Sequence, residues 1–122
     1  MGSRSRRRAR RGEQAPAAPA ATTDHRDDEG GVLTLRDDLS AGTLRELADL
    51  DAKPAASAED RSQRRVEFLF ERLAVRWEIA GLPLEGQKEL LGRYRMASSG
   101  ERRRVRTILA EHLAAKHPEI DL

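Results

Sequence analysis

The chain contains no cysteine, and its aromatic residues are limited to two Phe, one Trp and one Tyr. Without thiols it can form no disulfide, zinc–thiolate site, iron–sulfur cluster or cysteine nucleophile. No apolar run approaches the roughly 20 residues of a membrane-spanning helix, and no apolar stretch follows the arginine-rich start, as it would in a secretory signal. We therefore expect no membrane partner and a cytoplasmic location, in a bacterium because the composition favours Ala, Arg and Gly. An arginine-rich start is also compatible with an organelle transit peptide.

Size and charge restrict the hydrophobic core to the second half of the chain. The 122 residues suffice for one domain, and 36% of them are charged against 38% that are hydrophobic. Only residues 57–122 carry enough apolar side chains for a core, and a domain of that length is marginally stable on its own. We expect a disordered leader with a Pro/Ala linker at 1–31, an extended segment with a short docking helix at 32–56, and a helical bundle at 57–122.

The leader combines positive charge with too few apolar residues to fold. Its first twelve residues contain no acid, and their arginines are Arg4, Arg6, Arg7, Arg8, Arg10 and Arg11. The linker QAPAAPAATT follows at 14–23, and then the acidic stretch DHRDDEGG. Because guanidinium groups match the oxygens of phosphate, we expect the leader to bind nucleic acid weakly and without sequence preference.

A long helix is predicted between Ser57 and Gly81. Ser57 is a suitable N-cap, and Asp60 follows where a carboxylate favours the positive end of the helix dipole. Gly81 and Pro83 come after the last periodic residue, and both are typical of positions just beyond a helix C-terminus. The resulting helix, residues 58–80, contains both Phe residues and the only Trp.

The apolar residues of this helix fall on two opposite faces. The first face is formed by Val66, Phe70, Leu73, Trp77 and Ala80. The second face is formed by Phe68, Val75 and Ile79. Either the chain itself covers both faces, or the second face binds another protein chain or a second copy of this one. For the latter alternative, the candidate partner interface is Phe68, Val75 and Ile79.

The remaining periodic segments complete an all-α prediction. Beside the central helix, the predicted helices are residues 44–51, 84–97 and 101–116. The first begins at a capping box of Thr43 and Glu46, and the last at one of Ser98 and Glu101. The run VLTL at 32–35 is the only strand-like segment, and alone it has nothing to pair with. The expected fold is a small three-helix bundle with a short fourth docking helix, preceded by the disordered leader.

The last predicted helix begins with arginines. After Glu101 come Arg102, Arg103, Arg104 and Arg106, although the positive end of the helix dipole disfavours cations. These side chains are either a solvated helix start, partly neutralised by neighbouring acids, or an anion-binding patch. For the second alternative, the candidate nucleic-acid contacts are Arg102, Arg103 and Arg106, together with the leader arginines.

Nothing in the sequence indicates catalysis or cofactor binding. It lacks the motifs of phosphate-binding loops, G-x-S-x-G hydrolases, H-E-x-x-H metalloproteases and EF-hands. His25 falls in the acidic part of the leader, and His112 lies on an apolar stripe, as a hydrogen-bonded core histidine does. His117 follows five residues later, whereas a helical metal pair is four apart. We therefore expect no enzyme, no catalytic residue, no metal, no cofactor and no small-molecule substrate.

Two functions from different classes fit these features. The first is a non-enzymatic protein-interaction or regulatory module that self-associates as a homodimer, with accessory nucleic-acid contacts by the leader. The alternative is a nucleic-acid-binding protein that uses the leader and the Arg102–Arg106 cluster. Residues 57–122 hold nearly equal numbers of basic and acidic residues, whereas a dedicated nucleic-acid domain has a clearer basic excess. For this reason we place the interaction module first.

Overall fold

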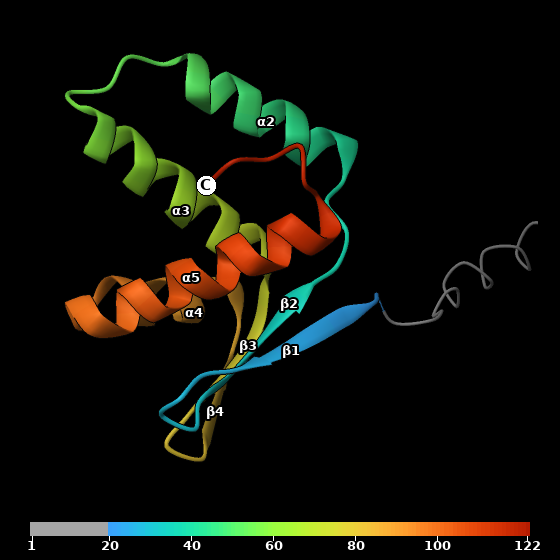
Figure 1. Ribbon diagram of the computed structural model, residues 1–122, viewed down its shortest axis with the longest axis vertical. Coiled ribbons are helices and arrows are strands. Elements are labelled where there is room, and N and C mark those ends of the chain that lie inside the picture. The colour runs from blue at the N-terminus through green and yellow to red at the C-terminus, as the bar shows by residue number, and fades with distance from the viewer. Residues whose placement is uncertain (1–19) are drawn as a thin grey trace, which may run out of the picture.

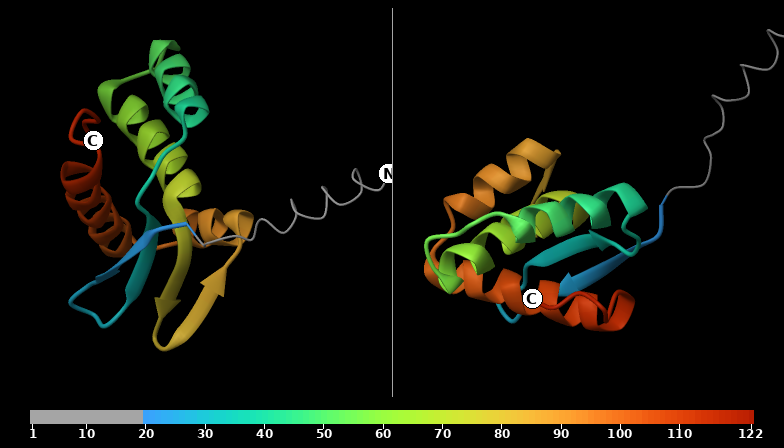
Figure 2. Two further views of the ribbon diagram at one scale, coloured as in Figure 1. Left: turned by 90° about the vertical axis from the view of Figure 1, so that its right-hand side faces the viewer. Right: turned by 90° about the horizontal axis from the view of Figure 1, so that it is seen from above.

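The computed structural model describes residues 20–122, and in this part of the chain a four-stranded antiparallel sheet packs against α-helices (Figure 1). In chain order the elements are β1 Thr22–Arg26, β2 Val32–Arg36, α2 Ala41–Ala52, α3 Ala58–Leu73, β3 Ala74–Ile79, β4 Leu82–Glu85, α4 Gln87–Arg95 and α5 Ser99–Lys116. Helix α3 runs directly into β3, and α2 lies along α3 (Figure 2).

The predicted all-α bundle is wrong, because the central helix ends early. Helix α3 stops at Leu73, and the backbone becomes extended at Ala74, with φ −71° and ψ 128°. Val75, Trp77 and Ile79 are two residues apart, a spacing that suits a strand as well as it fits two opposite faces of a helix. Pairing decides between the two, since β3 lies between β2 and β4 and forms ladder hydrogen bonds with both.

The sheet has the order β1-β2-β3-β4, and every neighbouring pair is antiparallel. Residues 22–26, which we assigned to the disordered leader, form β1 and pair with β2. The VLTL segment is not a lone strand but the body of β2, and its Leu33 and Leu35 are buried. The turn between the two strands is held by Asp27, whose carboxylate accepts hydrogen bonds from the backbone N–H groups of Glu29 and Gly31.

A tight turn at Ala80 and Gly81 joins β3 to β4. Both residues have positive φ, 54° and 79°, as the two central residues of a type I′ hairpin turn require. Gly81 therefore ends a strand and not the predicted helix. Pro83 lies in edge strand β4, where its missing backbone N–H is tolerated. The predicted helix at 84–97 is correspondingly divided between β4 and α4.

The N-caps of two helices were predicted correctly. Ser57 is the N-cap of α3, as expected. The predicted capping box of Ser98 and Glu101 opens α5. Helix α2 begins earlier than predicted, because Ser40 is its N-cap and accepts a hydrogen bond from the backbone N–H of Thr43.

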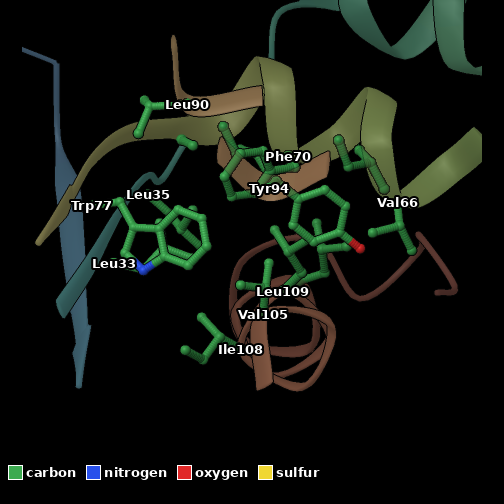
Figure 3. Packing of buried hydrophobic residues seen from close by; sticks show 14 of the residues in the cluster. Leu33, Leu35, Val66, Phe70, Trp77, Leu90, Tyr94, Val105, Ile108 and Leu109 are labelled. Carbon is green, nitrogen blue, oxygen red and sulfur yellow. The ribbon is translucent and has the colours of Figure 1, made fainter. Parts of the chain in front are cut away.

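One hydrophobic core joins the helices to the sheet. Phe70 lies at its centre, with its ring centroid 5.8 Å from that of Trp77 and 5.1 Å from that of Tyr94. Figure 3 shows these rings surrounded by side chains from β2, α3, α4 and α5. Val66, Phe70, Leu73 and Trp77, which we predicted to share the first face, are all buried, although Trp77 comes from a strand. Ala80, the fifth residue of that predicted face, is exposed in the turn after β3.

Candidate functional site

Four arginines lie on the first two turns of α5, beside its buried stripe. The stripe is Val105, Ile108, Leu109, His112 and Leu113. Arg102, Arg103 and Arg106 lie within about 100° of one another around the helix axis, at 100° per residue, whereas Arg104 lies on another side. We call Arg102, Arg103 and Arg106 the arginine surface of α5. Arg103 and Arg106 are exposed, and Arg102 is half-buried.

No member of the arginine surface forms an ion pair with a carboxylate of residues 20–122. Arg102 instead donates a hydrogen bond from Nη1 to the backbone oxygen of Ala97 at 2.7 Å. The neighbouring arginines of α4 differ, because Arg93 pairs with Glu101 at 3.0 Å and Arg95 is paired as well. The pKa of Glu101 is lowered by its hydrogen bond from Arg93 and by the backbone N–H of Ser98. The carboxylate of Glu101 thus stays ionised and is paired with Arg93, whereas no carboxylate of residues 20–122 pairs with the arginine surface.

The arginine surface borders a groove of about 510 Å³ between α3 and α5, with α4 at one end. We call it the α3–α5 groove. Its lining residues are Glu59, Ser62, Gln63, Glu67, Tyr94, Arg95, Ser99, Arg102, Arg103 and Arg106. The lining is therefore almost entirely polar, and one wall is basic.

The acidic wall of the groove is largely neutralised. Arg95 donates from Nε and Nη2 to Oε1 of Glu67, at 3.1 and 2.8 Å. Gln63 donates to the other carboxylate oxygen of Glu67 at 3.4 Å. Glu59 is the remaining lining carboxylate, and it lies on the first turn of α3, eight residues before Glu67. At 1.5 Å per residue this places the two about 12 Å apart along the helix. The end of the groove near α4 is consequently positive.

Tyr94 lies between the groove and the core. Only 3% of this residue is exposed, and its ring stacks on that of Phe70 with an interplanar angle of 28°. The hydroxyl points toward the space between α3 and α5 (Figure 3), and it has no hydrogen-bond partner among the described residues. Burial raises the pKa of Tyr94, while the charges of Arg106 and Arg102 oppose this shift. The group is therefore a protonated donor near two cations.

The predicted nucleic-acid contacts are only partly placed by the structure. Arg102, Arg103 and Arg106 line one groove together. The leader arginines lie outside the described residues, and they are Arg4, Arg6, Arg7, Arg8, Arg10 and Arg11. Sequence reasoning missed Tyr94 and the groove, because each depends on how α3, α4 and α5 pack.

The predicted partner interface is not the face of one helix. Phe68 lies on α3, whereas Val75 and Ile79 lie on β3. The guanidinium of Arg72 lies 4.7 Å from the ring centroid of Phe68, and the same side chain pairs with Glu46 of α2 at 3.1 Å. All three predicted interface residues are half-buried. Helix α2 therefore covers part of the side of α3 that we had assigned to a partner.

A pair of histidines that the sequence analysis did not predict joins the edge strand β1 to α5. Nε2 of His25 lies 2.9 Å from Nδ1 of His112, and Nε2 of His112 lies 2.7 Å from the backbone oxygen of Arg36. Because a carbonyl only accepts, Nε2 of His112 donates to it, and the neutral ring then accepts from His25 at Nδ1. Burial lowers the pKa of His25, and the charge of His112 lowers it further. Within the described residues no three His, Asp or Glu side chains are grouped as metal ligands.

Comparisons with known proteins add no functional information. No protein-family model matches the sequence, and no curated protein or solved structure matches it either. Among the described residues no helix is both long and apolar enough to cross a membrane. Function is therefore inferred from the arginine surface and the groove.

Proposed function

We propose that the protein is a non-enzymatic nucleic-acid-binding protein that contacts phosphates through the arginine surface of α5. The observation that carries this proposal is the absence of a carboxylate partner for Arg102, Arg103 and Arg106 within residues 20–122. A planar guanidinium presents its donors in a geometry that fits phosphate oxygens. Three such groups on one side of a helix supply several phosphate contacts at once. The leader arginines add a second, tethered group of cations.

The near-neutral charge of the chain does not argue against this function once the charges are placed in space. Glu67 and Glu101 are engaged by Arg95 and Arg93, so these acids do not neutralise the arginine surface. The affinity is expected to be modest and independent of base sequence, because contacts to phosphate position a protein without reading bases. The ring of Tyr94 is stacked inside the core and is not free to stack on a base.

Charge reversal on the arginine surface tests this function. The substitutions Arg103→Glu and Arg106→Glu change exposed side chains and leave the core intact. We expect the double variant to lose most of its affinity for short DNA and RNA, measured by fluorescence anisotropy. Arg45→Glu is the matched control, because Arg45 is exposed on α2 and unpaired within the described chain. Equal affinity of wild type, the double variant and Arg45→Glu would rule out binding by the arginine surface. If binding is lost only when residues 1–12 are deleted, the leader is the binding site.

A protein-interaction module that self-associates is the second candidate function. It is favoured by Leu82, which is 74% exposed on edge strand β4. An exposed apolar side chain beside an unpaired strand edge is a frequent site of chain association. Pro83 follows it and removes one of the donors that such pairing would use.

A further inference from the structure

The hydroxyl of Tyr94 has the features of a ligand-binding group. The residue is 97% buried, since 3% of it is exposed, and its ring is fixed by the stack on Phe70. Its oxygen has no partner in the part of the chain that the structure describes, and it lines the α3–α5 groove. The hydroxyl oxygen is not one of the fully buried polar atoms that lack a partner, so the small exposed part of Tyr94 includes the hydroxyl, which opens into the groove. A ligand in the groove can therefore accept a hydrogen bond from it.

The charges that share the groove with this hydroxyl favour an anion as its partner. Arg102 and Arg106 line the same groove as Tyr94, and their positive charges oppose the rise in its pKa. Glu67 acts in the opposite sense, but its carboxylate is held by Arg95 and Gln63. The groove therefore presents a donor hydroxyl and two guanidinium groups. An anion with several oxygens can accept hydrogen bonds from all three.

The chemistry of the phosphate group distinguishes a terminal phosphate from one inside a strand. A phosphate inside a strand is joined to the chain on both sides and carries one negative charge. A terminal phosphate monoester is attached on one side only, carries up to two negative charges near neutral pH, and presents three free oxygens. The groove of about 510 Å³ leaves room for the attached sugar beside Ser62 and Ser99.

We propose that the α3–α5 groove binds the terminal phosphate of a nucleic-acid strand, with the Tyr94 hydroxyl and the guanidinium groups of Arg102 and Arg106 as its donors. This inference rests on the proposed nucleic-acid function and names the group of the ligand that the groove recognises. A 5′-phosphate, a 3′-phosphate and free phosphate share this chemistry. The strand beyond the terminal phosphate lies over the exposed Arg103.

Binding of one oligonucleotide in three forms tests the inference with the full chain. A single-stranded oligonucleotide is prepared with a 5′-phosphate, with a 3′-phosphate and with neither, and each is titrated with wild type and with Tyr94→Phe. A hydrogen bond to a charged group changes affinity by about tenfold or more. We expect wild type to prefer one phosphorylated form by about tenfold, and Tyr94→Phe to lose that preference. The preferred form shows which end enters the groove.

Tyr94→Phe keeps the aromatic ring and its stack on Phe70, so unchanged thermal unfolding shows that the variant is folded. Tyr94 is also the only tyrosine, and selective ¹³C labelling of its Cζ gives a single signal. We expect this signal to shift on adding the preferred oligonucleotide or inorganic phosphate. Double-stranded DNA with unphosphorylated ends should leave it in place.

The outcomes separate this inference from the function on which it rests. If all three oligonucleotides bind equally to both proteins, while charge reversal at Arg103 and Arg106 weakens binding, the groove inference is wrong and the nucleic-acid function stands. If inorganic phosphate shifts the Tyr94 signal but no oligonucleotide binds, the phosphate site is supported and the nucleic-acid function is wrong. If neither phosphate nor any oligonucleotide moves the signal, the groove does not bind phosphate.

Discussion

Replacing Leu73 with Ala should remove a large share of the stability of this protein. Leu73 is 0% exposed and lies where α3 passes into β3. Removing three buried carbons costs about 2.4 kcal/mol at 0.8 kcal/mol each, and the cavity raises the total to about 3–4 kcal/mol. Trp77 is the only tryptophan and is 4% exposed, so its fluorescence reports unfolding in urea. With a slope of about 1.5 kcal/mol per M, the midpoint should fall by about 2 M.

The matched control is Leu82→Ala. Leu82 loses the same atoms but is 74% exposed, so its substitution should change the free energy of unfolding by less than about 0.5 kcal/mol. Equal losses for the two variants, or a loss below about 1 kcal/mol for Leu73→Ala, would refute the packing described above.

Three further predictions concern pH, the hairpin turn and association. Burial lowers the pKa of His25 in the folded protein, and Glu111, Asp24 and Asp37 weaken this lowering. The neutral form of His25 therefore stabilises the fold at pH values above its ordinary pKa of 6.5. This stability is lost as the pH falls through the lower pKa of the folded protein. The melting temperature should therefore drop on acidification, and His25→Gln should flatten this drop; an equal drop in both proteins would exclude His25. Gly81→Ala should lower the free energy of unfolding in urea by about 1–2 kcal/mol, because the φ of Gly81 is +79°. Gly92→Ala inside α4 should raise it by about 0.5–1 kcal/mol. Changes of the same sign in both variants would contradict the turn at Gly81. If β4 mediates self-association, the sedimentation mass should rise with concentration in wild type and not in Leu82→Ser, and a constant monomer mass in wild type would end that candidate.

The sequence predicted the starts of α3 and α5 because the signals for them are local, whereas α2 begins at Ser40 and not at the predicted capping box of Thr43 and Glu46. Ser57, Ser98 and Glu101 act on backbone groups three residues away, and these caps were identified correctly. The sheet could not be recognised in this way. Leu33 pairs with Trp77 across the β2–β3 ladder, 44 positions further along, and only that pairing shows that residues 74–79 are extended.

In the candidate site, too, only the residues that are close together in the sequence could be predicted. Arg102, Arg103 and Arg106 were identified from their spacing on one helix, and the structure places them along one groove. The Tyr94 hydroxyl could not be singled out, because it becomes a lining group only when α4 packs against α3 at the end of the α3–α5 groove. The contact between His25 and His112 joins residues 87 positions apart, and helical or strand periodicity carries no information at that separation.

The salt dependence of binding to a short DNA duplex tests the central claim most directly. Each phosphate contact contributes about 0.9 to the slope of log affinity against log salt concentration. If α5 contacts phosphates, replacing Arg103 and Arg106 by Gln should make this slope shallower by about 2, whereas Arg45→Gln should leave it unchanged. Identical slopes and affinities for wild type and the double variant would show that the arginine surface of α5 does not bind nucleic acid.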